Sequence, residues 1–451
     1  MKVFVIGTGK IGRTIVEHCC NEGHVVVVID TDSQAVEDII NKYDVMGIVG
    51  NGASYDIQKD AGVDKSSLVI AATSSDETNI LSCLVAKKLG SKSTIARVRS
   101  YEYMNQLNII KNDLGITMTI NPEYEATSEI MKIIDFPEVI RVDSFAKGNV
   151  DLVELYLPED SPLVNQSLIS IYQKYQVKIL VCAVQRNEKV HIPTGSFELK
   201  AKDKIYVTAK RSNLRKFLNK INLIENKIRT VMIIGGGKMS LYLGKALLKS
   251  KYQVKIIERD LKRCEELSQL LPSASIIYGD GSDQNVLVEE GINDTDAVVC
   301  LTGSDEENMI ISMYAYKQKV HKVITKINRT SLVGLMESLS MVSVISPREI
   351  VASSIVSYVR SYNNSRGSNV ITLHKLVNNK VEALEFNAKE DKRILNIPLK
   401  DLKLKNKILI AGIIRDGEVI IPNGNDVIML NDSVIVVTTN QYLDDLKDIL
   451  E

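Results

Sequence analysis

The residues with the clearest chemical pattern are three glycines near the amino terminus, Gly7, Gly9 and Gly12. They follow a short apolar run and precede a stretch with helical periodicity that begins with Lys10 and Ile11. Glycines at this spacing permit a tight turn, close approach of the backbone to a pyrophosphate, and packing of a helix on a strand. The start of the helix would direct free N–H groups at the phosphates. The pattern predicts a dinucleotide-binding loop, and a Rossmann-like turn that binds nothing is the alternative.

Asp30 supports this prediction because it ends the next apolar run, about 20 residues after the last glycine, as in dinucleotide sites. A carboxylate at this place accepts hydrogen bonds from a ribose and repels a 2′-phosphate. We therefore expect NAD(H), or an adenosine nucleotide, to be preferred over NADP(H).

The same pattern returns in the second half of the chain as Gly235, Gly237 and Ser240, with Lys238 and Met239 at the start of the next helical stretch. Ser240 replaces the third glycine with a larger residue, which weakens the expected site. Dinucleotide sites accept alanine at this position, so serine is still compatible with one. Glu258 takes the place of Asp30, and Arg259 follows it. We expect a second, less ideal nucleotide site in this copy.

Polar residues follow the third and fourth apolar runs of each copy, where an open α/β sheet places its ligand. The expected contacts there are Asn51, Thr73, Ser74, Asp280 and Thr302.

Helix capping explains the same loops equally well, because Ser74-x-x-Glu77 and Ser304-x-x-Glu307 both have the spacing of a capping box. Under this interpretation Ser75, Asp76 and Asn79 recur because they start a helix, and not because they bind a ligand.

Arg97 ends the fifth apolar run, within reach of a phosphate in this topology, and its counterpart Lys326 keeps the positive charge. A solvated surface position is the alternative for both.

Groups for catalysis are not evident in the sequence. A dehydrogenase needs a proton donor or acceptor near the hydride site and a lobe that binds substrate. The pairs Tyr55-x-x-x-Lys59 and Tyr206-x-x-x-Lys210 match short-chain reductases in spacing only, because the first comes too early in the sheet and the second lies outside it. We therefore expect a protein that is not an enzyme and holds no metal.

Composition excludes further classes of protein. The chain has 56 Lys and Arg against 56 Asp and Glu, so it lacks the net positive charge that attracts nucleic acids. Its longest apolar runs, 25–29 and 408–414, are far shorter than the ~18 residues of a membrane span. The amino terminus carries no export signal, and the six cysteines form no C-x-x-C pair. We expect a cytoplasmic protein with reduced thiols.

An internal duplication organises the 451 residues. Beyond the glycine motifs, Gly50-Asn51-Gly52 returns as Gly279-Asp280-Gly281, and the Pro-x-Gly turn at 193–195 returns at 422–424. Short apolar runs at 2–6, 25–29, 47–49, 68–72 and 93–98 alternate with helical stretches, which is typical of a doubly wound parallel sheet. The predicted class is α/β: two Rossmann-like parallel-sheet domains (1–137 and 225–362), each followed by a small β/α domain (138–224 and 363–451). Residues 360–369 are the expected linker before the last domain.

These motifs together resemble the TrkA family of bacterial and archaeal potassium-uptake proteins, with two tandem RCK (regulator of potassium conductance) units. The resemblance covers essentially the whole chain, with Ser240 and Asn51 as departures from the family pattern. It implies a regulatory gating subunit that binds NAD(H), and in some members ATP or ADP. It also implies a homotetramer, peripheral on the inner face of the plasma membrane, beneath a TrkH-like membrane subunit that carries potassium. The alternatives are an NAD-dependent oxidoreductase and a nucleotide-sensing module of another transporter.

We predict that NADPH binds the first site less tightly than NADH, because its 2′-phosphate would meet Asp30. Calorimetry of the purified protein with both cofactors measures the difference. Equal affinities would show that this carboxylate points elsewhere.

Overall fold

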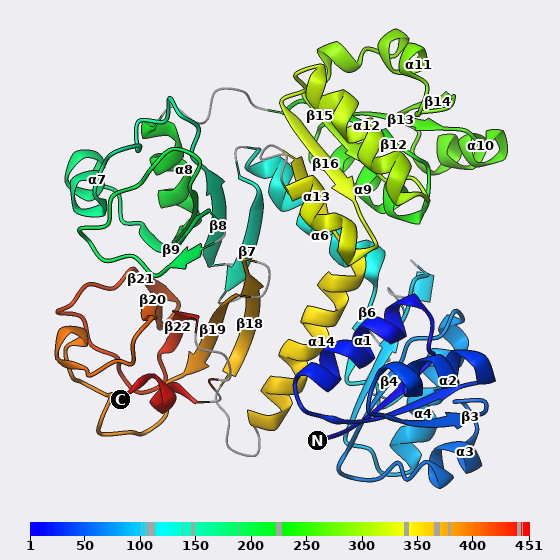
Figure 1. Cartoon of the computed structure of the whole chain (residues 1–451). Helices are drawn as coiled ribbons and strands as arrows, with labels where there is room; N and C mark the ends of the chain where they lie inside the picture. The colour runs from blue at the N-terminus through cyan, green and yellow to red at the C-terminus, as the bar shows by residue number, and fades with distance from the viewer. Residues whose placement is uncertain are drawn as a thin grey trace. The chain divides into compact units, whose positions relative to one another are not determined.

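The structure is a computed structural model that describes the chain except for residues 101, 104–105, 107–112, 138, 146–148, 188, 222–227, 338–341, 365–369, 378–379, 440–442 and 444. Four sheets follow one another along the chain, two of them parallel and two antiparallel (Figure 1). We call them the first N-lobe (2–120), the first small lobe (141–210), the second N-lobe (230–345) and the second small lobe (370–438). This arrangement confirms the predicted α/β class.

The first N-lobe is a six-stranded parallel sheet in the order β3-β2-β1-β4-β5-β6. Its strands are mostly apolar and mostly buried, because helices cover a parallel sheet on both faces, although Val25, Met46 and Val49 are exposed. Chain order reverses between β1 and β4, which places the glycine loop at the switch point where such sheets bind ligands. The elements are β1 (Lys2–Ile6), α1 (Lys10–Asn21), β2 (Val25–Asp30), α2 (Ser33–Lys42), β3 (Met46–Val49), α3 (Tyr55–Asp60), β4 (Ser67–Ala71), α4 (Asp76–Lys88), β5 (Ser93–Arg97) and β6 (Met118–Ile120).

The second N-lobe repeats this topology in the order β14-β13-β12-β15-β16-β17, again all parallel. Its elements are β12 (Thr230–Ile234), α9 (Lys238–Lys249), β13 (Gln253–Glu258), α10 (Leu261–Leu270), β14 (Ser275–Tyr278), α11 (Gln284–Glu289), η2 (Ile292–Asp294), β15 (Ala297–Cys300), α12 (Asp305–Lys317), β16 (Lys322–Lys326), α13 (Thr330–Glu337) and β17 (Val342–Ile345).

The small lobes are five-stranded antiparallel sheets. The first contains β7 (Arg141–Phe145), β8 (Val150–Tyr156), α7 (Leu168–Tyr175), β9 (Leu180–Arg186), β10 (Lys189–His191), β11 (Lys204–Lys210) and α8 (Arg211–Lys220). The second contains β18 (Val370–Leu376), β19 (Val381–Asn387), η3 (Leu399–Asp401), β20 (Ile408–Arg415), β21 (Glu418–Ile420), β22 (Ser433–Thr438) and η4 (Leu446–Ile449). The described part of the second small lobe therefore has short 3₁₀ turns where the first has α-helices.

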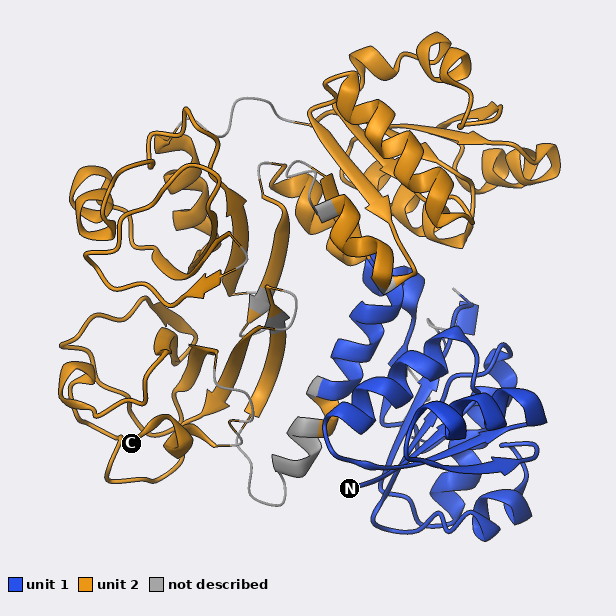
Figure 2. Cartoon of the chain, viewed as in Figure 1, with its two compact units in different colours: residues 1–127, 346–356 blue, residues 128–345, 357–451 orange. Residues whose placement is uncertain are grey.

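Two longer helices follow the N-lobe sheets, α6 (Pro122–Asp135) and α14 (Pro347–Asn364). The expected linker at 360–369 is wrong in part, because residues 360–364 extend α14, while 365–369 lie outside the described residues. The chain divides into two compact units, residues 1–127 with 346–356, and residues 128–345 with 357–451 (Figure 2). This division is coarser than the four predicted domains, whose boundaries stay a prediction.

The first unit therefore combines the first N-lobe with the start of α14. His18 Nε2 on α1 lies 3.1 Å from Glu349 Oε2, and the Ser354 hydroxyl donates to Glu125 Oε2 at 3.1 Å. These contacts attach a segment from the second half of the chain to the first parallel sheet.

Within the second unit the two small lobes share one hydrophobic core. Phe145, Leu152 and Cys182 pack in the same cluster as Leu376, Ala411 and Val437 from the other lobe. The Thr208 hydroxyl donates to the Ala411 carbonyl at 3.0 Å, across 203 residues of sequence. This cluster is therefore completed by both small lobes, while a second hydrophobic cluster of the first small lobe contains residues from 136 to 221 only.

A buried ion pair recurs in both small lobes. Arg186 donates Nε and Nη2 to the fully buried carboxylate of Asp203 at 2.8 and 2.7 Å, and Arg415 does the same to Asp432 at 2.9 and 2.7 Å. Each carboxylate also accepts a backbone N–H, from Lys200 and Met429 respectively. This bidentate ion pair joins the end of β9 to the turn before β11 in the first small lobe, and the end of β20 to the turn before β22 in the second.

We predict that Asp203→Ala lowers the free energy of unfolding by about 2–3 kcal/mol, since it leaves a guanidinium and a backbone N–H without their acceptor. Asp432→Ala should behave alike, because the contacts are the same. Urea denaturation followed by circular dichroism measures both, with the exposed Asp160→Ala as the control. A loss no larger than that of the control would contradict the assignment.

Candidate functional site

The first glycine loop is held by the carboxylate of Asp30. Thr8 donates its backbone N–H and its hydroxyl to Asp30 Oδ2 at 2.6 and 2.7 Å, and the Asp32 N–H donates to Oδ1 at 3.1 Å. Partial burial tends to raise the pKa of Asp30, but these hydrogen bonds outweigh it and hold the pKa below its usual range. Asp30 is therefore a charged hydrogen-bond acceptor next to the loop. Both of its carboxylate oxygens already accept hydrogen bonds from the protein, from Thr8 and Asp32. Its contact with a ribose stays a prediction.

The three glycines of this loop are required for different reasons. Gly7 has φ +97°, and a Cβ there would lie 2.7 Å from the Thr73 backbone nitrogen. A Cβ on Gly12 would lie 1.9 Å from the Gly7 carbonyl oxygen. Gly9 has an ordinary φ of −65°, and a Cβ there would have no neighbour within 4 Å. The fold requires glycine at positions 7 and 12, whereas at position 9 it leaves open space before the first N–H groups of α1.

The second loop has the same geometry. Gly235 has φ +96°, and Gly237 precedes α9 with φ −66° and no neighbour for a Cβ. The buried Ser240 fits because its hydroxyl donates to the Gly235 carbonyl, the atom that glycine would have approached. Glu258 accepts from the Gly236 N–H at 2.5 Å and the Asp260 N–H at 2.8 Å. The departure at Ser240 therefore leaves the loop intact.

A buried asparagine joins the loop after the fourth strand to the end of the fifth. Asn79 Oδ1 accepts from the Thr73 N–H and hydroxyl at 2.8 and 2.7 Å. Its amide nitrogen donates to the carbonyls of Thr73 and Arg97 at 3.2 and 2.9 Å. Asn308 makes three of these four contacts in the second N-lobe: its Oδ1 accepts from the Thr302 N–H at 2.8 Å, and its amide nitrogen donates to the carbonyls of Thr302 and Lys326 at 3.4 and 3.0 Å. The recurrence of this asparagine has a structural cause.

The helices that follow these loops begin at Ser75 and Ser304. The Ser75 hydroxyl accepts from the Thr78 N–H at 3.1 Å, and the Ser304 hydroxyl from the Glu307 N–H at 3.2 Å. The expected box Ser74-x-x-Glu77 is therefore wrong by one residue, because Ser75 is the N-cap of α4. The second cap was placed correctly.

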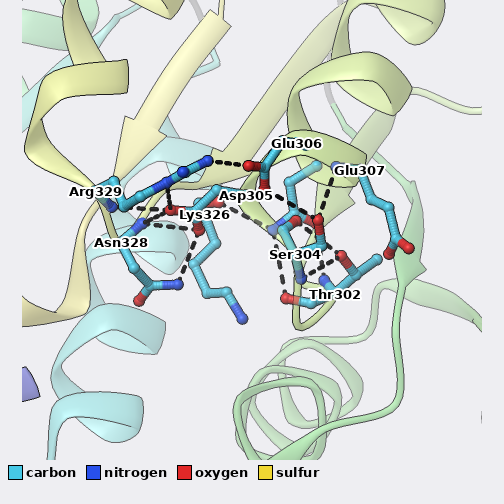
Figure 3. Close-up of polar contacts among 9 residues, drawn as sticks. Thr302, Ser304, Asp305, Glu306, Glu307, Lys326, Asn328 and Arg329 are labelled. Atoms are coloured by element: carbon cyan, nitrogen blue, oxygen red, sulfur yellow. Dashed lines mark hydrogen bonds and ion pairs between the residues drawn. The ribbon is translucent and has the colours of Figure 1, made fainter.

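The next residue, Asp76 or Asp305, binds the backbone that follows the fifth strand. Asp76 Oδ2 accepts from the N–H groups of Arg99 and Ser100 at 2.9 and 2.8 Å. In the second N-lobe Asp305 accepts from Asn328 and Arg329, and Arg329 also pairs with Glu306 (Figure 3). Among Ser75, Asp76 and Asn79, the capping interpretation therefore holds for Ser75 only. Asp76 and Asn79 have other structural contacts, and Thr73, Ser74 and Thr302 stay predicted nucleotide contacts.

Arg97 is a half-buried cation at this edge. Its Nη1 donates to the Thr73 carbonyl at 3.3 Å, and its buried Nε has no hydrogen-bond partner among the described residues. Burial, and then the nearby Arg99, lower the pKa of Arg97, while Glu123 and Asp76 oppose the change. Arg97 is half-buried, and its contact with a phosphate stays a prediction. Lys326 donates in the same way to the Leu301 carbonyl at 3.3 Å.

Asn51 and Asp280 follow the third strand of each N-lobe and stabilise their own loops. Asn51 Oδ1 accepts from the Ala53 N–H at 2.9 Å, and Asp280 Oδ1 accepts from the Ser282 N–H and hydroxyl at 2.9 and 2.7 Å. Both lie at the carboxyl edge of the sheet, as predicted. Sequence reasoning missed Thr8, whose hydroxyl between two glycines was the available signal, and Arg99, which donates to the Ser74 carbonyl at 2.6 Å.

Over the described residues, no group of three or more His, Cys, Asp or Glu side chains could hold a metal ion. In the same part of the chain, no helix is both long and apolar enough to cross a bilayer. Burial raises the pKa of the Cys19, Cys83, Cys182 and Cys300 thiols to about 12.

Comparison with known proteins agrees with the duplication. The TrkA-N domain model matches residues 3–122 and 231–347, and the TrkA-C domain model matches residues 152–222 and 383–451. The chain is 30% identical to the Trk system potassium uptake protein TrkA of Halomonas elongata over 442 residues, 97% of this chain and 95% of that protein. It is 28% identical to the TrkA protein of Vibrio alginolyticus over 456 residues, 100% of this chain and 99% of that protein.

Solved structures of similar fold include the GsuK channel bound to NAD, with a TM-score of 0.63 and 14% identity over 98% of this chain and 77% of that chain. GsuK bound to ADP matches with a TM-score of 0.52 and 12% identity over 80% of this chain and 69% of that chain. At these identities the likeness shows the fold alone.

We predict that Gly7→Ala lowers the free energy of unfolding by about 1–3 kcal/mol, because it forces alanine into a left-handed backbone against Thr73. Gly9→Ala should change it by less than about 1 kcal/mol, because its φ is ordinary and its surroundings are open. Urea denaturation of both variants gives the comparison, and Gly235→Ala with Gly237→Ala repeats it in the second N-lobe. Equal losses at positions 7 and 9 would mean that the fold itself requires Gly9.

Proposed function

The chain belongs to the TrkA family, and on that premise we propose that it is a nucleotide-binding regulatory subunit of a Trk-type potassium uptake system. Its similarity to relatives named Trk system potassium uptake proteins, over nearly the full length of both chains, supports the proposal. Its partner is a TrkH-like membrane subunit that translocates potassium. We further propose that the chain is cytoplasmic, docks on the inner face of the membrane, and assembles as a homotetramer.

The observation that carries nucleotide binding is the open space in front of Gly9 and Gly237. The fold does not need a glycine at either position. A glycine at the start of a helix, where the first N–H groups have no acceptor within the helix, suits a ligand that approaches the backbone closely. A pyrophosphate would lie against the N–H groups at Lys10 and Ile11, and at Lys238 and Met239 in the second N-lobe. The bound nucleotide supplies binding energy in this proposal and takes part in no redox step.

Two charged groups fit the remaining parts of such a ligand. Asp30 or Glu258 would accept from the adenosine ribose, since a carboxylate can accept more hydrogen bonds than the protein makes to it here. The buried Nε of Arg97 has no hydrogen-bond partner among the described residues. Arg97 would bind a phosphate, because a guanidinium group can donate two parallel hydrogen bonds to one. The residues present therefore fit NAD(H), and the same diphosphate contacts fit ADP or ATP. Structures of GsuK bound to NAD and to ADP support this ligand class.

The nucleotide would act by shifting a conformational equilibrium. A ligand biases two states only through its different affinity for them, so its contacts must change between the states. The loops around Gly9, Asn51 and Ser75 come from three separate elements of one sheet edge, and a ligand that draws them together would alter their spacing. No observation on the described residues favours the oxidoreductase alternative.

We predict that NADH changes the open probability of the TrkH-like partner with the wild-type protein and does so less with Gly9→Asp. Position 9 has space for an aspartate side chain, so the variant is expected to fold. Its carboxylate would repel the pyrophosphate. Single-channel recording of the partner with each protein is the measurement, and calorimetry confirms that NADH binding is lost. If the nucleotide acts equally through both proteins, or neither affects transport, the gating proposal is wrong.

A further inference from the structure

The two N-lobes differ in charge at three equivalent positions around the glycine loop. The first N-lobe has the neutral residues Thr31, Asn51 and Thr78, and the second has Arg259, Asp280 and Glu307. With Asp30 and Glu258 included, the first loop is surrounded by one net negative charge, and the second by two, since Arg259 offsets one of three carboxylates. The difference lies where the proposed nucleotide would bind.

Resting on the proposed function, we infer that the second N-lobe selects its nucleotide by charge, through Arg259, Asp280 and Glu307. It accepts NAD⁺ and discriminates against nucleoside triphosphates more strongly than the first N-lobe does.

The geometry places these charges at the mouth of the second loop. Arg259 directly follows β13, and Glu307 lies in the first turn of α12, which follows β15. β13 and β15 are the two neighbours of β12, whose end carries the glycine loop. The ion pair between Arg259 Nη1 and Glu307 Oε1, at 3.6 Å, therefore joins the two sides of that loop.

The Glu307 carboxylate is directed away from the network around Arg329. Figure 3 shows Arg329 with Asp305 and Glu306 on one side, while Glu307 points the other way. Asp280 belongs to the same group of charges, because the N–H of Gly279 before it donates at 3.0 Å to the carbonyl of Glu258, the residue before Arg259. The pKa of Asp280 is lowered first by the N–H and hydroxyl of Ser282 and then, with burial opposing, by Arg259. Arg259 therefore interacts with two carboxylates, Glu307 and Asp280, beside the glycine loop of the second N-lobe.

The cations that support the two loops do not cancel this difference. In the first N-lobe Arg13 Nε donates to the Thr8 carbonyl at 3.1 Å, and in the second Arg263 Nε donates to the Gly236 carbonyl at 2.7 Å. Arg13 lies on α1 and Arg263 on α10, but each donates a hydrogen bond to a backbone carbonyl of its glycine loop. Lys10 is likewise matched by Lys238, so Arg259, Asp280 and Glu307 remain as the difference.

Charge can distinguish these ligands because NAD⁺ and a nucleoside triphosphate contain the same kind of phosphate group but differ in the number of phosphates. A nucleoside triphosphate carries more negative charge than NAD⁺, so added carboxylates penalise it more. Repulsion of the wrong ligand is an established way to obtain specificity without new attraction. Because these side chains are partly exposed, the selectivity should weaken as salt screens the charges.

The test isolates each site in the full-length protein. Gly9→Asp leaves only the second site, and Gly237→Asp leaves only the first, with calorimetry of NAD⁺ and of ATP giving the ratio of their dissociation constants. We expect the preference for NAD⁺ over ATP to be about tenfold greater at the second site, the scale of one to two added charges at these separations.

Exchanging the charges should move this ratio in both directions. Asp280→Asn with Glu307→Thr should return the second site to the ratio of the first, and Asn51→Asp with Thr78→Glu should raise the ratio at the first. Arg259→Thr should raise the ratio at the second site further, because it removes the offsetting cation. All these side chains are on loops or first turns, so each variant is expected to fold, as circular dichroism will show.

The outcomes separate the inference from the function on which it rests. If neither site binds any nucleotide, the proposed function fails and the inference with it. If both sites bind but the exchanges leave the ratio unchanged, only the inference is wrong. Tighter binding of NADPH than NADH at the second site would also overturn it, since Arg259 would then be a ligand for a 2′-phosphate.

Discussion

The side-chain amide of Asn79, and of Asn308 in the second copy, is the interaction on which the candidate site depends. Its oxygen and nitrogen bind the Thr73 backbone on one side and the Arg97 carbonyl on the other. A fully buried amide is costly unless its groups are satisfied, so the two loops it joins have few other arrangements open to them. Because Thr73 is fixed, the turn at Gly7 must pass against it without a side chain, and the Arg97 guanidinium is left beside the Thr73 carbonyl.

Much of this arrangement could be predicted from the sequence, because its signals are local. Apolar runs gave the buried strands to within a residue or two, since parallel strands covered on both faces need unbroken apolar sequence. The left-handed turn at Gly7 and the helix start at Lys10 follow from the same short motif. The repeat of both, together with the Pro-x-Gly turns, predicted two copies of a two-part unit.

What could not be predicted depends on contacts between residues far apart in the chain. The attachment of Glu349 to His18 and the burial of Arg97 arise only when distant segments meet. The cap at Ser75 was misplaced because two adjacent serines both fit a capping pattern, and tertiary contacts of the loop decide between them.

The shared core of the small lobes has a consequence for how the protein is made. Thr208 and Ala411 stand 203 residues apart, so the first small lobe leaves the ribosome long before the surface that covers it exists. At about 5–20 residues per second, this interval is roughly 10–40 s, much longer than the collapse of a small domain. During it, the face around Phe145, Leu152 and Cys182 is open to chaperones and to other nascent chains. Neighbouring ribosomes on one message could therefore exchange small lobes between two chains, giving a swapped dimer whose cores are the same as those formed within one chain.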